Sequence, residues 1–451
     1  MTRNTELHPT PTGPNAETGS PAPHLQESLN TREMKRILAS SFVGSAIEYY
    51  DFILYATAAS IVFNKVFFAN QDPAVAIFAS FATLAVGYIA RPLGGIVFGH
   101  FGDRIGRKKM LVLSMMMMGL ATMLIGLLPA TAQIGVAAPT ILVALRVIQG
   151  IAVGGEWGGA ALMALEHAPK KQRGFATSFA NAGGPAGALL ATLVVSAVSA
   201  ATGDNFLVWG WRVPFLLSAV LIAVGLLIRL KVTETPLFRQ LEQASEKRKI
   251  PLVEVFRHHR RAVILALVAT MSFYCCQGLL TVWGVSIAVE AGADRTGVLN
   301  WKAAGAVLTL IVTLWSARMS DRVGRRRMLV IGGVLGVVLA YPLLVLLNNG
   351  TLWGFAVALI VGQGIIQGIL YGPIGAYVAE QFPTSVRYTG ASLAYQGAST
   401  LGAGFTPMIA AGLLILGGGS VILVAGFWAA VMLAGTVAVL ITKESSRTDL
   451  A

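Results

Sequence analysis

Apolar runs of about 20 residues recur along the chain from Ile37 to Thr442, and they constrain its fold more than any other feature. A helix of that length crosses the ~30 Å hydrocarbon core of a bilayer. Only 12% of the 451 residues are charged, whereas a soluble domain carries roughly 25%. The sequence therefore predicts an all-α integral membrane protein. Twelve predicted spans lie near residues 37–63, 77–101, 109–128, 138–165, 174–200, 211–230, 262–289, 300–318, 327–347, 352–378, 389–416 and 420–442.

Arginine and lysine gather in alternate loops between these spans. The other loops hold little more than Lys65, Arg212, Arg295 and Lys302. Because basic loops remain on the cytoplasmic side, the pattern predicts an inner (plasma) membrane protein with both termini in the cytoplasm. It also accounts for the net charge of +13 without a nucleic-acid partner. The clusters are Arg32, Lys35, Arg36, Arg104, Arg107, Lys108, Lys109, Lys170, Lys171, Arg173, Lys247, Arg248, Lys249, Arg257, Arg260, Arg261, Arg322, Arg325, Arg326 and Arg327.

The longest internal polar segment, residues 231–261, divides the spans six and six. We expect it to be a central cytoplasmic loop between an N-terminal six-helix bundle over 32–230 and a C-terminal six-helix bundle over 262–442. Residues 1–31 are rich in Pro, Thr, Asn and Gly and predict a disordered cytoplasmic tail. Residues 443–451 are expected to form a short cytoplasmic C-terminal tail.

A charged hairpin between two spans occurs once in each half. GHFGDRIGRKKM covers Gly99–Met110 and SARMSDRVGRRRM covers Ser316–Met328, and Asp103 and Asp321 are 218 residues apart. Two further loops, after predicted helices 4 and 10, each have Pro at the third residue after Glu and Arg at the seventh. Repeats at matching positions indicate a transporter built from two repeated bundles. The charged residues concerned are Asp103, Arg104, Arg107, Glu166, Arg173, Asp321, Arg322, Arg325, Glu380 and Arg387.

Five ionisable residues lie well inside predicted spans, away from the span ends, where charge is costly and usually faces a partner or a water-filled cavity. Glu48 and Asp51 share one face of helix 1, and Arg146 of helix 4 lies at a depth similar to Asp51. Arg91 and Glu156 lie deeper, toward the cytoplasmic side. The functional interpretation is that Arg146 binds an anionic substrate while Glu48 or Asp51 carries a proton. The alternative is two structural pairs, Asp51 with Arg146 and Glu156 with Arg91.

Helical stripes of polar residues mark three further spans. Helix 4 carries Arg146, Gln149, Val153 and Glu156 along one face. Helices 7 and 10 carry hydrogen-bonding groups in place of charge, which suits a small hydroxylated acid. The alternative is that these groups only join neighbouring helices. The stripes of helices 7 and 10 are Tyr274, Gln277, Thr281, Gln363, Gln367 and Tyr371.

Several of these stretches resemble the major facilitator superfamily over nearly the whole chain after the tail. The GHFGDRIGRKK hairpin is similar to its signature between helices 2 and 3, and RVIQG (Arg146–Gly150) to its helix 4 signature. More narrowly, the chain resembles the metabolite:H+ symporter family, and within it the shikimate-transporter-like branch. The stretches that carry this resemblance are EYYDFILY (48–55), RPLGGIVFGHFGDRIGRKK (91–109), RVIQGIAVGGEWGGA (146–160), GWRVPFLLSA (210–219), ETPLF (234–238) and VRYTGAS (386–392).

The resemblance implies twelve helices in two six-helix bundles, with helices 1, 4, 7 and 10 around a central cavity. It implies substrate-binding roles for residues on the stripes, and a charged network from the hairpins and loops that latches the halves when the cytoplasmic side is closed. The expected substrate-binding residues are Arg146, Gln149, Tyr274, Gln277, Gln363, Gln367 and Tyr371.

We therefore expect a proton-coupled symporter that imports a small organic acid, not an enzyme, and acts as a monomer in the bilayer. No phosphate-binding G-x-x-x-x-G-K-[S/T] loop is present, and the adjacent Cys275 and Cys276 inside a span suit neither a disulfide nor a zinc site, so no cofactor or metal is expected. One alternative is symport of a zwitterionic osmolyte such as betaine or proline. The resemblance implies a long C-terminal coiled coil for osmosensing members of that kind, and the eight residues after Lys443 hold no heptads, which argues against this alternative. The others are drug efflux by antiport and a non-transporting receptor.

Overall fold

The computed structural model describes residues 31–444 except 106, 155–172, 232–254, 256 and 384–385. The chain divides into two compact units, Met1–Ile37 and Leu38–Ala451, and only the first turns of helix α1 are described in the former. Every regular element in the described ranges is a helix. Most of the predicted tail (1–31), most of the central loop (231–261) and most of the C-terminal tail (443–451) lie outside the described residues.

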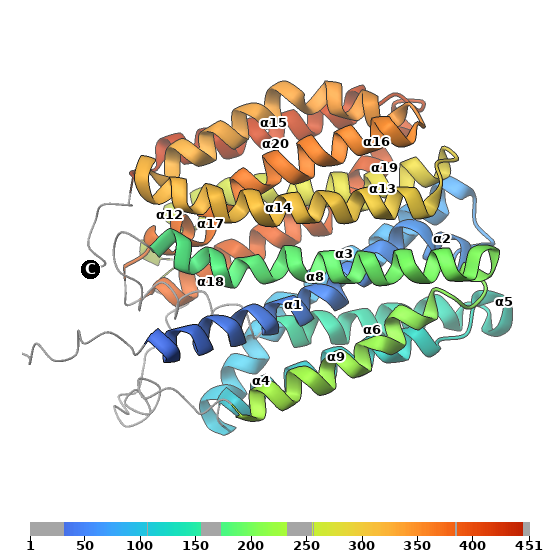
Figure 1. Ribbon diagram of the computed structural model, residues 1–451, viewed down its shortest axis with the longest axis horizontal. Coiled ribbons are helices and arrows are strands. Elements are labelled where there is room, and N and C mark those ends of the chain that lie inside the picture. The colour runs from blue at the N-terminus through green and yellow to red at the C-terminus, as the bar shows by residue number, and fades with distance from the viewer. Residues whose placement is uncertain are drawn as a thin grey trace, which may run out of the picture. The chain divides into compact units, whose positions relative to one another are not determined.

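A helix lies in each of the first six predicted spans (Figure 1), and residues 155–165 of the fourth lie outside the described residues. These helices form because long apolar runs satisfy their backbone groups internally, as a membrane interior requires. Pro92 of α3 and Pro185 of α8 lie within helices, which neighbouring helices can support in a membrane. The elements are α1 (Thr31–Ile61), α2 (Phe63–Val66), α3 (Pro73–Ile105), α4 (Arg107–Leu127), α5 (Thr131–Ile134), α6 (Ala137–Val153), α8 (Arg173–Thr202), the 3-10 segment η3 (Gly203–Phe206) and α9 (Arg212–Lys231).

The second six spans are also helical, and three of them contain a π-helical segment. Such segments are rare and often occur at functional sites. The elements are α12 (Arg260–Gly278), η4 (Leu279–Trp283), α13 (Gly284–Glu290), α14 (Arg295–Val323), α15 (Arg325–Asn348), α16 (Leu352–Ala358), η5 (Leu359–Gln367), α17 (Gly368–Glu380), α18 (Arg387–Ser399), η6 (Thr400–Gly404), α19 (Thr406–Leu416) and α20 (Ile422–Ile441), of which η4, η5 and η6 are π-helical.

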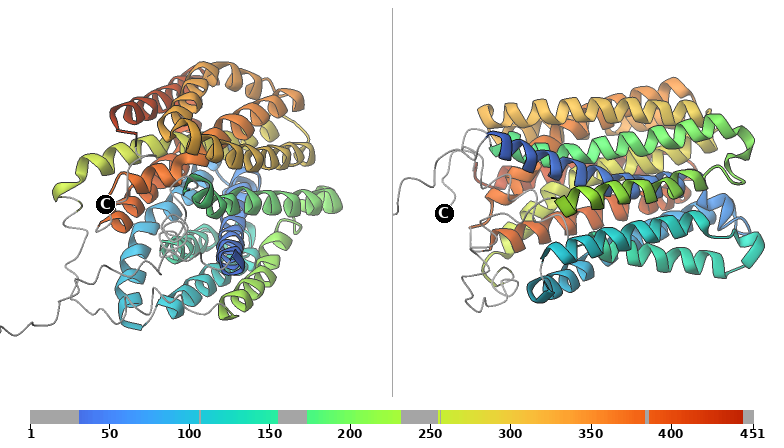
Figure 2. Two further views of the ribbon diagram at one scale, coloured as in Figure 1. Left: turned by 60° about the vertical axis from the view of Figure 1, so that its left-hand side comes forward. Right: turned by 60° about the horizontal axis from the view of Figure 1, so that its bottom comes forward.

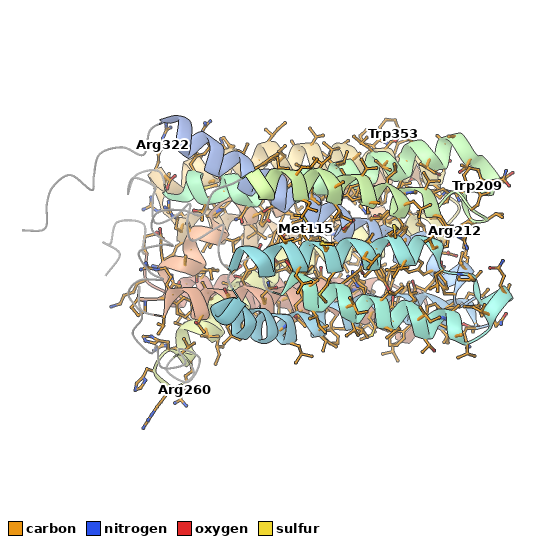
Figure 3. The ribbon with its side chains drawn as sticks, turned by 90° about the horizontal axis from the view of Figure 1, so that it is seen from below. Met115, Trp209, Arg212, Arg260, Arg322 and Trp353 are labelled. Carbon is orange, nitrogen blue, oxygen red and sulfur yellow. The ribbon has the colours of Figure 1, made fainter. Side chains whose placement is uncertain are left out.

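Length and composition fit a membrane. Among the described residues, eight helices are long and apolar enough to cross one, and three shorter helices are also apolar. Large apolar side chains such as Leu127 and Val338 are exposed on their outer surfaces, as lipid contact allows. Figure 3 shows Arg260 and Arg322 at one end of the helices, which we call the basic end, and Trp209 and Trp353 toward the opposite end. Exposed tryptophans near the end of a span are typical of a membrane interface.

The two halves meet mainly through α8 of the first half and α14 of the second, which lie side by side (Figure 1, Figure 2). On another face of α14, small residues such as Gly305 permit close approach to η5. Helix α3 contacts α19 and η6 in a second inter-half region. These two contact regions flank the cavities described next.

Candidate functional site

A narrow cavity with about 430 Å³ of empty space lies between the halves, and we call it the central cavity. Helices α1 and α8 supply one side, and α12, η4, α14, η5 and α17 supply the other. None of its described lining residues is acidic. The polar lining residues are Tyr49, Thr192, Gln277, Thr281, Lys302, Thr309, Gln363, Gln367 and Tyr371.

Four of the predicted substrate-binding residues thus come together in the central cavity. Gln363 and Gln367 lie on the π-helical segment η5, and Gln277 lies one residue before the end of α12. The side-chain Oε1 atoms of Gln363 and Gln367 are buried and accept no hydrogen bond. Buried polar atoms of this kind usually have a partner, so two acceptors are available to a bound molecule.

An aromatic wall closes one side of this cavity. The rings of Phe273 and Tyr371 are stacked with centroids 4.3 Å apart, and the Tyr371 hydroxyl donates to the Tyr49 hydroxyl at 3.4 Å. Gly184 of α8 permits this contact, because a Cβ there would lie 3.0 Å from Tyr371 Oη and 3.3 Å from the Tyr49 ring. The wall offers an apolar face to a ligand with polar groups at its edge.

Lys302 is the cavity residue that sequence analysis placed wrongly. The structure begins α14 at Arg295, five residues before the predicted span, so Lys302 lies about two turns inside the helix and not in a loop. Asp294 caps this helix, with its Oδ2 accepting from the Gly297 N–H at 2.6 Å. That cap, an Asp before a helical run, was the sequence signal that could have located the helix start.

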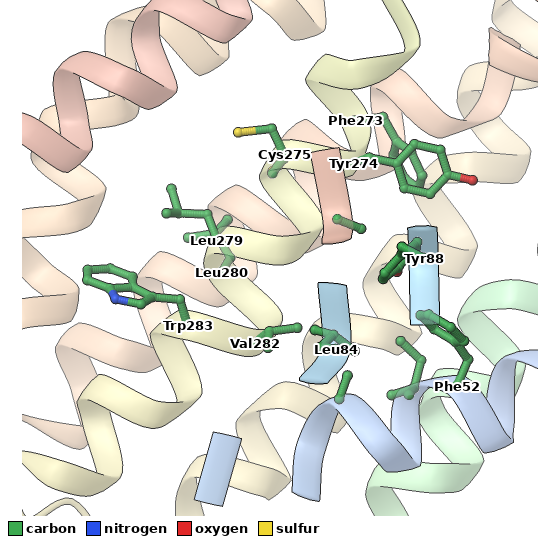
Figure 4. Close-up of a cluster of buried hydrophobic side chains, with 14 of the residues drawn as sticks. Phe52, Leu84, Tyr88, Phe273, Tyr274, Cys275, Leu279, Leu280, Val282 and Trp283 are labelled. Carbon is green, nitrogen blue, oxygen red and sulfur yellow. The ribbon is translucent and has the colours of Figure 1, made fainter. Parts of the chain in front are cut away.

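A second cavity, the side cavity, has about 280 Å³ of empty space and shares the lining residue Tyr49 with the central cavity. Glu48, Arg91 and Tyr274 line it, so it joins one of the two predicted proton carriers to an intramembrane arginine. The Arg91 guanidinium lies over the Phe52 and Tyr88 rings at 4.2 and 4.4 Å, and these two rings contact each other with centroids 4.7 Å apart (Figure 4). The side cavity is completed by Tyr395 and Gln396 of α18.

Arg146 and Gln149 of α6 line neither cavity. The Arg146 guanidinium is buried against the Phe52 and Tyr55 rings at 4.4 and 4.0 Å and donates to Gln149 Oε1 at 3.1 Å. Gln149 in turn donates to Thr122 of α4 at 2.8 Å. The first-half interior, not the central cavity, surrounds this pair.

Asp51 also faces the first-half interior. Its Oδ1 accepts from the Ser218 hydroxyl of α9 at 2.6 Å, and its side chain is buried. Within the described ranges no ion pair joins it to Arg146, so the alternative of an Asp51–Arg146 pair is wrong for this structure. The two residues lie at similar depth, and Thr122 lies between them, since it accepts from Gln149 and also contacts Asp51.

At the basic end, Asp321 of α14 joins the halves. Its carboxylate accepts from the backbone N–H groups of Gly174 and Phe175, in the first turn of α8, at 3.0 Å each. These N–H groups lack partners within their own helix, and the helix dipole favours negative charge there. Arg325 pairs with Asp321 at 2.7 Å and with Glu380 at 3.4 Å, which extends the network to α17.

The structure describes only some of the remaining predicted network residues. Arg387 is buried, and its Nε donates to the carbonyls of Ala379 and Phe382 at 3.2 and 3.1 Å. Arg322 is exposed. Glu156 and Glu166 lie outside the described residues, as do the side chains of Asp103, Arg104, Arg107 and Arg173.

The opposite end is also closed by contacts between the halves. Ser196 of α8 donates to Asn300 of α14 at 2.5 Å, and Arg295 donates to Ser199 at 2.8 Å. Lys65 lies 3.5 Å from the Glu290 carboxylate. The halves therefore touch at both ends of the helices, with the central cavity between the two sets of contacts.

The comparisons agree with this architecture. The Major Facilitator Superfamily model matches residues 41–315 and 286–450. The shikimate transporter of Escherichia coli (strain K12) is 39% identical over 424 residues, covering 93% of this chain and 97% of that protein. The proline/betaine transporter of Salmonella typhimurium (strain LT2) is 33% identical over 400 residues, covering 86% and 79%. A crystal structure of a D-xylose-proton symporter shares the fold with a TM-score of 0.72 at 17% identity, covering 92% of this chain and 98% of that one.

Proposed function

Because the chain belongs to the major facilitator superfamily, we propose that it is a proton-coupled symporter that imports a small organic acid, such as shikimate or a related mono- or dicarboxylate, by alternating access. The observation that carries this proposal is the central cavity between the halves. It combines hydrogen-bonding side chains and one cation, Lys302, with no acidic side chain among its described lining. Such a lining favours a small anion with hydroxyl groups.

Separate contacts at the two ends support alternating access. Asp321 with α8 closes the basic end, while the Ser196–Asn300 and Lys65–Glu290 contacts close the opposite end. Breaking one set while the other holds would open the central cavity to one side only. We propose that the basic end faces the cytoplasm and that the protein lies in an inner membrane, with both termini on the cytoplasmic side, as its loop charges favour.

Glu48 is the better candidate for the proton carrier. It lines the side cavity with Arg91, whereas Asp51 accepts from Ser218 within the first half. Desolvation disfavours a charged carboxyl group and a nearby cation favours it. Moving Glu48 relative to Arg91 and to water during opening would therefore change its proton affinity. Asp51 lacks a described cavity through which a proton could arrive.

The test is transport in proteoliposomes. We expect counterflow of shikimate or another carboxylate from a panel of mono- and dicarboxylates, and accumulation that rises as external pH falls and collapses with a protonophore. Accumulation that is unaffected by a protonophore would contradict proton coupling. Counterflow by none of the carboxylates would contradict the substrate class.

A second candidate substrate is a betaine-like zwitterion. The aromatic wall of Phe273, Tyr371 and Tyr49 is the observation that favours it, since aromatic faces attract quaternary ammonium groups. Betaine and proline therefore belong in the same counterflow panel. Counterflow by betaine without counterflow by any hydroxylated acid would favour this candidate.

A further inference from the structure

The Lys302 ammonium is a buried cation in contact with both halves of the protein. Only 2% of the residue is exposed, and its Nζ donates to Thr57 Oγ1 of α1 at 2.8 Å. In the part of the chain that the structure describes, no acidic side chain lies within salt-bridge distance of it. An ammonium has three N–H donors, so Thr57 alone leaves donors for another acceptor. An isolated charge at this depth is costly, and such residues usually serve a functional pathway.

The positive charge and the hydrogen-bond acceptors in the central cavity match a ligand that carries both an anion and hydroxyl groups. Lys302 supplies positive charge, while the Oε1 atoms of Gln363 and Gln367 supply acceptors that have no partner. The Gln363 acceptor lies across from α14, where Gly305 leaves room for it: a Cβ there would be 2.8 Å from Gln363 Oε1. A ligand that fits would bring an anion to one side and hydroxyl donors to the other.

We propose that Lys302 anchors the carboxylate of the transported substrate, and that Gln363 and Gln367 accept hydrogen bonds from its hydroxyl groups. The assignment rests on the proposed function and narrows its substrate class to hydroxylated carboxylates. The stacked Phe273 and Tyr371 rings cover the carbon skeleton of the bound acid.

Arg146, another buried cation with N–H groups that have no partner among the described residues, fits this role less well. Its Nε and Nη2 lack partners, but its guanidinium lies between the Phe52 and Tyr55 rings and it lines neither cavity. A Cβ on Gly87 would collide with Arg146 Nε, so the side chain is tightly enclosed. Lys302 is therefore the cation that a ligand in the central cavity reaches.

The test is calorimetric binding to the purified full chain with three probes: shikimate, its primary amide, and cyclohexene-1-carboxylate. Lys302→Gln should weaken binding of both carboxylates about 10- to 100-fold, the effect of one charge-assisted hydrogen bond, and leave amide binding within about twofold. Gln363→Leu should weaken shikimate binding but not binding of cyclohexene-1-carboxylate, which has no hydroxyl groups. The matched control is Lys443→Gln, since Lys443 is exposed just after α20 and lines neither cavity.

The outcomes separate this assignment from the proposed function. Lys302→Gln that weakens amide and carboxylate binding equally, or weakens neither, would overturn the role of Lys302. The proposed function would still stand if the wild-type protein binds the carboxylates. Wild-type binding of betaine but of none of the carboxylates would overturn both. Should Lys302→Gln fail to elute as a folded monodisperse protein, Lys302→Arg provides the test. It keeps the charge and should bind both carboxylates within about tenfold of wild type, and a loss of carboxylate binding equal to the loss of amide binding would overturn the assignment.

Discussion

Removing the charge of Asp321 should loosen the basic end by an amount that the structure allows us to work out. The carboxylate accepts two backbone N–H groups of α8 at 3.0 Å each, with an 8% exposed side chain. In Asp321→Asn one acceptor oxygen remains, and an NH2 group faces an N–H donor. The loss of one charge-assisted hydrogen bond is worth roughly 1.5–3 kcal/mol, or roughly a 10- to 100-fold shift toward the form that is open at this end.

Cysteine accessibility measures that shift. We would introduce Ala188→Cys on the central-cavity wall and label it with a membrane-impermeant maleimide in vesicles that expose the basic end. The native Cys275 and Cys276 are fully buried, so the protein without the added cysteine gives the background. Labelling should be at least about tenfold faster in Asp321→Asn than in the parent.

The control makes the same chemical change where no contact between the halves is lost. Asp72 lies in a turn before α3 at the opposite end, and its Oδ1 accepts only from the nearby Ala74 N–H among its described contacts, at 3.0 Å. Asp72→Asn should leave the labelling rate unchanged. An unchanged rate in Asp321→Asn, or an equal increase in both variants, would refute the argument that this carboxylate closes the basic end.

Three further expectations follow from the buried and exposed charges. Glu48→Gln should abolish pH-driven accumulation and keep counterflow, whereas Asp51→Asn should still accumulate substrate; the reverse result would move the proton site to Asp51. Lys302→Met should raise the thermal denaturation midpoint of the substrate-free protein by a few degrees, because replacing an unpaired buried charge by an apolar side chain is often stabilising; a lower midpoint would show that its contact with Thr57 outweighs the desolvation cost. Glu290→Gln should change the counterflow rate by less than about fivefold, since its pair with Lys65 is partly exposed and such pairs contribute at most about 1 kcal/mol; a larger loss would show that this pair controls opening.

The sequence predicted the helices and one face of the site because both depend on periodicity. Apolar runs located all twelve spans, and the i, i+4 spacing of Gln363 and Gln367 placed them on one face. Periodicity and depth do not tell which neighbouring helix a side chain meets. For that reason similar depth left an Asp51–Arg146 pair open as an alternative, whereas the two side chains contact Ser218 and Gln149.

An error in one predicted helix boundary also misplaced a residue of the central cavity, Lys302. Arg295 and Lys302 lower the local hydropathy, so the predicted span began at residue 300 and left Lys302 close to its edge. A cap formed by Asp294 fixes the real start, and its signal is one residue long. The π-helical segments could not be predicted either, because the 3.6-residue period of the apolar pattern does not report a single wider turn. Yet η5 carries two of the three glutamines among the described lining of the central cavity.

Helix α1 links the two cavities, which bears on how proton and substrate would be coupled. Glu48 lines the side cavity, Tyr49 lines both cavities, and Thr57 accepts the hydrogen bond from Lys302. A substrate carboxylate that draws the Lys302 ammonium farther into the central cavity would lengthen its hydrogen bond to Thr57 and so weaken a contact between α14 and α1. Because Glu48 lies on the same helix, a change in how α1 packs would also alter its distance from Arg91. Coupling by this route needs no contact between proton and substrate, and it requires only that both ligands favour the same position of α1.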